Sequence, residues 1–325
     1  MRHALITGGA GSIGLHLART LLRDDWRVTL LDNFQRGQRD DDLRLVTSHE
    51  RVALLDVDLG APDAVAAPGT GFSHLFHLAA VLGVQDVLER PRAVLESNVA
   101  LTVAALELAR RQQALERFVF ASSSEVYAGT LEHFDLPIPT PETTPLALPA
   151  LDRPRTTYML SKLYGEALCL QSGLPVTIIR PHNVYGPRMG RSHVIPQLLE
   201  RAHRLGKGEA FEVFSVDHTR SFCFVDDAVE MIALLATAAA ARGRTVNVGT
   251  QTPEIRIGDL ARLVLATVGH AAEIAPRLPT AGSPVRRVPD MSACQALTGY
   301  RSRMALEDGL SHTYAWYRRS VFTAP

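Results

Sequence analysis

A glycine-rich segment directly after a short apolar run restricts the fold of this chain more than any other feature. Residues 3–7 (His-Ala-Leu-Ile-Thr) have the character of a buried strand, and residues 7–14 (Thr-Gly-Gly-Ala-Gly-Ser-Ile-Gly) lead into a helical pattern over residues 13–22. Glycines at this spacing allow a tight turn, a close approach of the backbone to a pyrophosphate, and close packing of helix on sheet. The helix N-terminus also favours an anion. We expect a dinucleotide phosphate site formed by Gly8, Gly11, Ser12, Ile13 and Gly14.

The end of the second apolar run indicates which dinucleotide binds. Residues 27–31 end in Asp32, 18 residues past Gly14. A carboxylate at that place hydrogen-bonds the adenosine ribose hydroxyls, and it would repel a 2′-phosphate. We therefore expect NAD rather than NADP, although Arg36 is nearby, and we expect Asp32 and Asn33 to contact it.

Further apolar runs alternate with helical patterns. This alternation is typical of a parallel, doubly wound sheet, so we predict an α/β fold of the Rossmann type. The length of 325 residues suggests about two domains. We assign residues 1–180 to an NAD-binding Rossmann domain with interleaved later segments, and residues 181–325 to a smaller, mixed substrate domain. The expected strands are residues 52–55, 74–78, 118–120 and 176–179, and the expected helices are residues 92–113 and 157–172.

The proline-rich residues 129–155 break this rhythm. We interpret them as an ordered loop or lid over the site, and the alternative is a plain surface excursion.

Composition excludes several classes of protein. Lys and Arg together number 34, as do Asp and Glu, so a broad basic face for nucleic acid is not expected. Cys169, Cys223 and Cys294 follow neither a metal-ligand nor a disulfide spacing, which favours a reducing cytoplasm and no metal. No apolar stretch reaches 18 residues and no signal peptide is recognised, so we expect a cytoplasmic protein without a membrane span.

Tyr158 and Lys162 lie four residues apart, on one face of an expected helix. A tyrosine has a reference pKa of about 10 and needs a neighbouring cation to act as a base near neutral pH. Lys162 supplies that cation and could also hold a nicotinamide ribose. Three serines, Ser122 to Ser124, follow the strand expected at residues 118–120.

Together these features resemble an extended short-chain dehydrogenase/reductase of the nucleotide-sugar epimerase/dehydratase/decarboxylase type. The resemblance covers nearly the whole chain in family order. Its motifs are TGGAGSIG at 7–14, Asp32, Asp58-Leu59, HLAA at 77–80, Asn98, SSSEVY at 122–127, YMLSK at 158–162, RPHNVYGP at 180–187, TRSFCFVDD at 219–227 and RRVPD at 286–290.

The resemblance implies a role for each matching residue. Ser123 would be the catalytic hydroxyl, because the family places it three residues before the Val of the Val-Tyr pair. The implied catalytic residues are Ser123, Glu125, Tyr158 and Lys162. The implied cofactor-binding residues, besides those above, are Asp58, Leu59, Leu78, Ala79, Ala80, Asn98, Tyr158, Lys162 and Pro181. The implied residues for a nucleotide-sugar substrate are Ser124, Asn183, Arg188, His193, Val194, Arg220 and Arg286.

The resemblance also implies NAD-dependent oxidation of the sugar at C4, after which the family reactions diverge. Family dehydratases resemble Thr-Asp-Glu where this chain has Ser123-Ser124-Glu125, so the expected acid is absent. Ser-Ser-Glu, GPRM at 186–189 and RRVPD look like uronic-acid decarboxylases, whereas RPHNVYGP and TRSF look as much like epimerases. We rank a 4-epimerase first, a nucleotide-uronic acid decarboxylase or a dehydratase second, and a non-catalytic NAD-binding regulator last.

The resemblance further implies a homodimer. Helices near 92–113 and 157–172 resemble the pair at the dimer interface of the family. In the first of them, one face could be shared by Leu95, Val99, Val103, Leu106 and Ala109. The alternative is that this face packs on the sheet.

Overall fold

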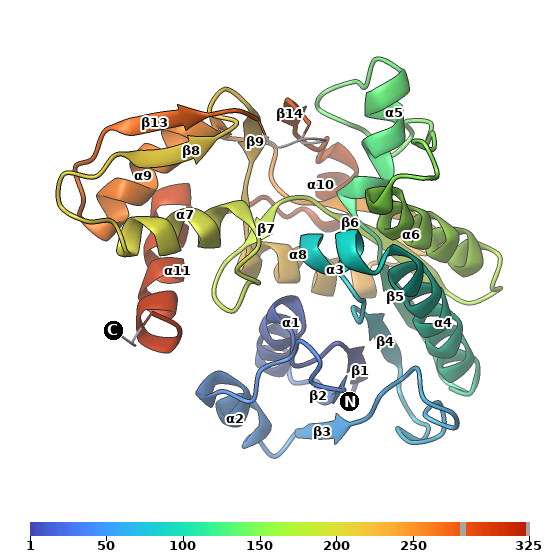
Figure 1. The fold of residues 1–325 in the computed structure, drawn as a ribbon. Helices are drawn as coiled ribbons and strands as arrows, with labels where there is room; N and C mark the ends of the chain where they lie inside the picture. The colour runs from blue at the N-terminus through green and yellow to red at the C-terminus, as the bar shows by residue number, and fades with distance from the viewer. Residues whose placement is uncertain (280–283, 323–325) are drawn as a thin grey trace.

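The computed structural model describes residues 1–279 and 284–322. Seven parallel strands form the central sheet in the order β11-β6-β5-β4-β1-β2-β3 (Figure 1). The apolar runs of the sequence form these strands because helices cover the sheet and bury them. The strands are β1 (His3–Thr7), β2 (Arg27–Asp32), β3 (Val52–Asp56), β4 (His74–His77), β5 (Arg117–Ala121), β6 (Val176–Pro181) and β11 (Thr245–Val248). The expected Rossmann-type, doubly wound parallel sheet is confirmed.

Two pairs of helices pack against this sheet. Helix α1 (Ser12–Arg23) contacts α8 (Val225–Thr237), and α4 (Pro91–Arg110) contacts α6 (Pro154–Leu170) (Figure 1). Gly165 allows α6 to approach β5 closely, because a Cβ at this position would overlap the ring of Phe120. Since α6 carries Tyr158 and Lys162, this contact sets their depth over the sheet.

The boundaries differ from the sequence expectation in a few places. The helix expected at 92–113 ends at Arg110, and the strand expected at 74–78 ends at His77. Segments from late in the chain, β11 and α8, return to the sheet, so the expected interleaving is present. A division of the chain at residue 180 stays a prediction.

Most of the remaining elements lie above the sheet in the view of Figure 1. The strands β7 and β10 pair, as do β8 and β13, and β9 pairs with both β12 and β14. These strands are β7 (Val184–Tyr185), β8 (Phe211–Phe214), β9 (Thr219–Ser221), β10 (Cys223–Phe224), β12 (Glu254–Arg256), β13 (Ile274–Arg277) and β14 (Arg286–Arg287). The helices are α2 (Asp41–Thr47), α3 (Val84–Glu89), α5 (Ala128–His133), α7 (Val194–His203), α9 (Ile257–Val268), α10 (Ser292–Thr298) and α11 (Leu306–Ser320), with 3-10 turns η1 (Ser124–Tyr127) and η2 (Ala239–Ala241).

The proline-rich segment 129–155 is ordered. It contains most of α5, whose Thr130 hydroxyl donates to the carbonyl of Pro145 (2.6 Å) and accepts from the backbone N–H of Ala147 (3.1 Å). The segment projects beyond the sheet (Figure 1), and its role as a lid stays a prediction.

Within the described part of the chain, no helix is long and apolar enough to cross a membrane. The three cysteines are buried and unbonded to one another.

Candidate active site

The glycine-rich turn follows β1, the strand at which the order of the sheet reverses. Strands β2 and β3 lie on one side of β1, and β4 lies on the other. Strand β1 pairs with β2 on one side and with β4 on the other, which makes their carboxyl ends the switch point where such sheets bind ligands. Gly8 has φ +70°, and a Cβ there would lie 2.9 Å from the backbone nitrogen of Ala79. A Cβ on Gly14 would overlap the carbonyl oxygen of Gly8. Only glycine therefore lets the β1 turn, the β4 end and α1 meet.

This turn fits the phosphates and ribose of NAD. Helix α1 has Gly11 at its N-cap, with no side-chain cap and no acidic residue in its first turn, so its first N–H groups remain available to an anion. Asp32 is held at the end of β2, because it accepts from the backbone N–H groups of Ala10 (2.9 Å) and Phe34 (2.8 Å). Beside it, Asn33 accepts from the backbone N–H of Gln35 (3.1 Å).

The other residues expected to contact the cofactor lie after β3, after β4, on α4 and at the end of β6. Ala79 donates its backbone N–H to the hydroxyl of Thr7 (3.3 Å), which links the β4 end to the glycine turn. Asn98 is buried and hydrogen-bonds both backbone groups of Val81, at 2.7 and 2.9 Å, so it fixes the segment that follows β4. The others are Leu78 and Ala80 after β4, the exposed Asp58 and buried Leu59 after β3, and Pro181 at the end of β6.

Ser123, Tyr158 and Lys162 come together at the carboxyl end of β5. The side chain of Ser123 lies next to that of Tyr158 and lowers its pKa. Lys162 donates to the carbonyl of Ala121 (2.8 Å), and its Nζ lies 5.8 Å from the centre of the Tyr158 ring. The structure thus brings the expected hydroxyl, phenol and ammonium into one site.

Burial shifts the pKa of both titratable members of this group. It raises the pKa of Tyr158 to about 12, against the opposing hydrogen bond from Ser123. It lowers the pKa of Lys162 to about 8. Tyr158 is therefore a phenol at neutral pH, suited to donate to an oxygen, and it needs added positive charge nearby to act as a base.

A buried ion pair supports this group from below. Glu166 accepts from Arg180 at 2.7 and 2.9 Å and from the hydroxyl of Ser122 at 2.5 Å. Arg180 also donates to the hydroxyl of Tyr127 (2.7 Å). Sequence reasoning missed Glu166 and Arg180; their signal was a charged residue one turn after Lys162 and another inside a buried strand. Ser122 thus hydrogen-bonds Glu166, and Ser123 is the serine next to Tyr158.

Glu125 pairs with an arginine that the sequence analysis did not select. Its carboxylate lies 2.8 Å from Arg287, and the guanidinium of Arg287 is the main cause of its lowered pKa, with Arg155 and Arg220 adding to it. The neighbouring Arg286, expected to bind substrate, instead pairs with Glu254 at 2.7 Å and is exposed. Arg287 was within the RRVPD motif, one position further on.

The other expected substrate residues occupy several segments. Asn183 has φ +42° and donates to the carbonyl of Ser221 (3.0 Å). Arg220 donates to the carbonyls of Thr219, Pro284 and Val285. Ser124 is buried in η1, while His193 and Val194 begin α7. Arg188 is buried and donates to the carbonyl of Ala10 in the glycine turn.

His182 is a buried, neutral histidine next to this site. The side-chain N–H₂ of Asn247 donates to two carbonyls, those of Thr140 (3.0 Å) and Asp290 (3.2 Å). Its oxygen therefore accepts, and Nε2 of His182 donates to it at 3.0 Å. Burial lowers the pKa of His182 to about 3. His77, under the glycine turn, also has its pKa lowered to about 3 by burial.

Within the described ranges, no group of three or more His, Cys, Asp or Glu side chains is arranged to hold a metal ion.

Comparisons with known proteins identify the family of this chain. The model of the NAD dependent epimerase/dehydratase family matches residues 4–249. UDP-glucuronic acid decarboxylase 1 of Xenopus tropicalis is 31% identical over 98% of this chain and 73% of its own length. UDP-N-acetyl-alpha-D-glucosaminuronate decarboxylase of Bacillus cytotoxicus is 29% identical over 98% of both chains.

Solved structures are similar over the same span. The dTDP-glucose 4,6-dehydratase DesIV of Streptomyces venezuelae, a structure with NAD bound, is 25% identical over 98% of this chain and 97% of its own, with a TM-score of 0.83. A UDP-galactose 4-epimerase is also among the similar structures. The cofactor of this family is NAD, as expected from Asp32.

The buried neutral histidines predict a loss of stability in acid. Between about pH 6.5 and 3 the unfolded chain binds a proton at His182 that the folded chain does not, so the free energy of unfolding falls as the pH falls. Each such group contributes up to about 1.4 kcal/mol per pH unit. In urea unfolding, the free energy of unfolding of His182→Phe should fall less steeply than that of the wild type as the pH falls, by about this amount per pH unit. The exposed His49→Phe is the control, and equal slopes for His182→Phe and the wild type would contradict the prediction.

Proposed function

Because this chain belongs to the NAD-dependent epimerase/dehydratase family, we propose that it oxidises a nucleotide-linked uronic acid at C4 and then releases CO₂ from C6. The broader statement, that family members act on nucleotide sugars as epimerases, decarboxylases or dehydratases, comes from the comparisons. The choice of decarboxylation is our proposal.

The first step uses Tyr158 and Ser123. Tyr158 takes the proton of the C4 hydroxyl as the ketone forms, and Ser123 hydrogen-bonds the same oxygen. Lys162, whose Nζ lies 5.8 Å from the centre of the Tyr158 ring, and the positive nicotinamide of bound NAD would together favour the phenolate. NAD, when bound to the glycine turn and Asp32, supplies the hydride acceptor for C4 and later the donor.

The proposal that the substrate is a uronic acid rests on the positive charge around Glu125. Three arginines, Arg155, Arg220 and Arg287, act on this one carboxylate, which leaves an excess of positive charge beside Ser123 and Tyr158. A sugar carboxylate at C6 would offset that excess. Glu125 is 42% exposed and Arg287 is 21% exposed, so a ligand can reach both.

Decarboxylation then needs no added acid. The C4 ketone makes the uronic acid a β-keto acid. The C5–C6 bond breaks, CO₂ leaves, and the electron pair moves into the C4 ketone as an enolate. Ser123 and Tyr158 hydrogen-bond the enolate oxygen, C5 takes a proton from water, and the ketone is reduced. Loss of water, by contrast, would call for an acid, and Ser124 stands where the family dehydratases have one.

Epimerisation at C4, which the sequence alone ranked first, is the second candidate. The pairing with Arg287 lowers the pKa of Glu125, and a carboxylate with a lowered pKa is a weak base. C4 epimerisation is the family reaction that least needs Glu125 as an acid or base, because the ketone has only to accept the hydride on its other face. The decarboxylase names of the relatives favour the first candidate.

The decisive experiment identifies the product from UDP-glucuronic acid and UDP-N-acetylglucosaminuronic acid labelled with ¹³C at C6, in deuterium oxide. We expect labelled CO₂ and a pentose product carrying deuterium at C5, detected by NMR. UDP-glucose, which lacks the carboxylate, is the matched control substrate. If uronic acids bearing UDP, dTDP, GDP, ADP or CDP release no CO₂ while a C4 epimer forms, the enzyme is an epimerase and the first proposal is wrong.

Glu125→Gln separates the same two reactions by mutation. In a decarboxylase the substitution weakens the pair that positions Arg287, and a misplaced guanidinium beside C6 should reduce CO₂ release about 10²-fold. In an epimerase it should leave substantial activity. The control is Glu254→Gln, which breaks the pair of the exposed Arg286 instead.

Ser123→Ala should reduce kcat by about 10²–10⁴-fold, because a positioned proton-transfer contact is lost. Ser124→Ala should have a much smaller effect on kcat. Ser122→Ala should lower the midpoint temperature of thermal unfolding and change kcat little, because it removes a donor to Glu166. Equal losses of kcat for Ser123→Ala and Ser124→Ala would count against this assignment.

We also propose a homodimer through α4 and α6. Val103 and Tyr164 expose apolar surface on these helices, at 49% and 53%. Leu106 and Ala109, which the sequence analysis placed on the same face, are buried within the protomer.

Tyr164→Asp should therefore give a monomer at micromolar concentration, measured by light scattering, because it puts a charge into the interface. Leu45→Asp, at an exposed apolar position on α2, is the control and should leave the mass unchanged. A monomeric wild type would rule out this interface.

A further inference from the structure

The segment 186–193, here called the substrate loop, is attached to the glycine turn. It connects β7 to α7 and contains Arg188 and His193, both expected at the sequence level to contact substrate. The hydroxyl of Ser12 donates to the carbonyl of Pro187 (3.0 Å), and Nη2 of Arg188 donates to the carbonyl of Ala10 (2.7 Å). The loop thus contacts the backbone that is expected to hold the cofactor phosphates.

Arg188 is the central residue of this attachment. It is 6% exposed and has φ +65°, so its side chain leaves the loop in a direction that an ordinary backbone would not give. Its guanidinium donates to Asp40, to Ala10 and, more weakly, to the carbonyl of Gln38 (3.4 Å). A planar guanidinium can serve several acceptors at fixed angles, which a lysine ammonium does not reproduce.

The groups that accept hydrogen bonds from Arg188 belong to segments near the expected cofactor site. The peptide of Ala10 accepts from Arg188 at its oxygen and donates from its nitrogen to Asp32 (2.9 Å). Asp40 caps α2 by accepting from the backbone N–H of Leu43 (2.9 Å). One guanidinium therefore joins the glycine turn, the carboxylate expected to bind ribose, and the start of α2.

In the pair of Arg188 and Asp40, one polar atom of each side chain makes no hydrogen bond to the described residues. Nε of Arg188 and Oδ2 of Asp40 are both buried and have no hydrogen-bond partner among the described residues. A buried polar atom without a partner is unfavourable, and Nε shares an edge of the guanidinium with Nη2, so a two-pronged contact of that edge with Asp40 would compete with the bond from Nη2 to Ala10. A small movement of the substrate loop can therefore change the strength of this contact.

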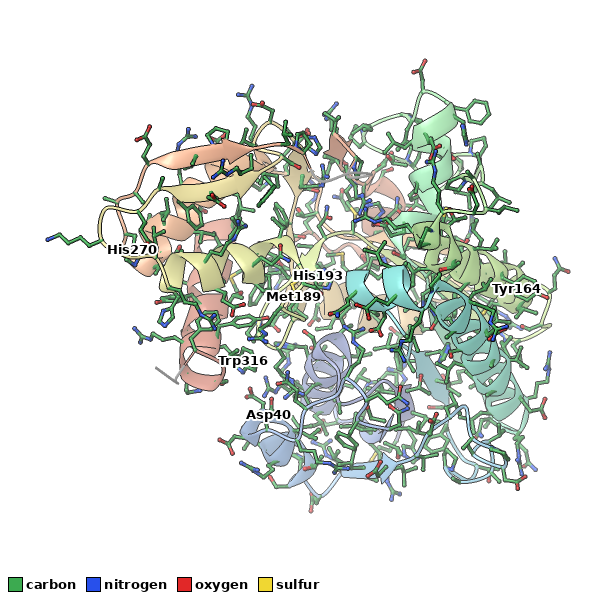
Figure 2. All side chains as sticks on the ribbon, in the orientation of Figure 1. Asp40, Tyr164, Met189, His193, His270 and Trp316 are labelled. Carbon is green, nitrogen blue, oxygen red and sulfur yellow. The ribbon has the colours of Figure 1, made fainter. Side chains whose placement is uncertain are left out.

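The outer side of the loop is held independently. Tyr317 on α11 donates to the carbonyl of Met189, and Trp316 donates from Nε1 to Asp42 on α2 (2.6 Å). Figure 2 labels Asp40, Met189, His193 and Trp316, which surround this junction. With its outer side attached to α11, the loop meets the glycine turn through Arg188 and through the bond from Ser12 to Pro187.

We propose that Arg188 is a positioning residue that transmits occupancy of the cofactor site to the substrate loop and the start of α7, and that it does not bind substrate itself. NAD bound at the glycine turn stabilises the Ala10 peptide, and Arg188 then fixes the loop so that His193 and Val194 face the substrate. This inference requires NAD binding but no particular reaction, so it stands or fails apart from the proposed decarboxylation.

Hydrogen exchange of the whole protein, with saturating NAD and after removal of NAD, tests this proposal. In the wild type, NAD should slow amide exchange about tenfold in residues 186–199, within the usual range of coupling between sites. It should also protect residues 8–16. Arg188→Lys and Asp40→Asn should keep the protection of residues 8–16 and lose that of residues 186–199. Asn can still cap α2, so Asp40→Asn removes the charge while keeping the helix start.

Arg191→Ala is the matched control, because this arginine is in the same loop but pairs with Glu200 at an exposed site. It should keep both protections. A wild-type loop that does not respond to NAD would overturn the proposal, as would full loop protection in both Arg188→Lys and Asp40→Asn. Loss of protection in residues 8–16 in both variants would overturn it too, since Arg188 would then be part of the cofactor site itself.

Discussion

The buried pair of Glu166 and Arg180 holds the catalytic helix in place on the sheet. Glu166 lies one turn after Lys162 on α6, and it joins Arg180 of β6 to Ser122 at the end of β5. Removing one partner of such a pair costs about 3–5 kcal/mol, because a buried charge is left uncompensated. With these contacts made, α6 cannot slide along the sheet, and Tyr158 stays within hydrogen-bonding reach of the β5 end.

The cofactor side depends on contacts between backbones. Gly8 meets Ala79, and Gly14 meets Gly8, at distances that exclude any Cβ. The same backbone continues into the Ala10 peptide, which serves Asp32 on one side and Arg188 on the other. The cofactor site and the substrate loop are therefore parts of one hydrogen-bonded structure, which is why a residue expected to touch substrate can act through the cofactor site.

Features that depend on local pattern were predictable from the sequence. Apolar runs form buried strands wherever helices cover them, so the order of strands and helices and the doubly wound sheet followed from periodicity. The glycine turn and Asp32 have their spacing because a dinucleotide has a fixed size. Tyr158 and Lys162 share a face because they are four residues apart on a helix. The cofactor followed from the glycine turn and Asp32, and the family followed from the resemblance of these and the later motifs to its members.

Partnerships between distant segments were decided only by the tertiary structure. Arg286 and Arg287 are adjacent on a strand, so they face opposite sides; Arg286 meets Glu254, whereas Arg287 meets Glu125. Only the pairing of β14 with β9 determines which of the two reaches the catalytic site. Arg188 likewise could have faced either ligand until its backbone conformation directed it to Ala10. A charged side chain can be recognised in a sequence, but its direction and partner depend on strands and loops brought together by the whole fold.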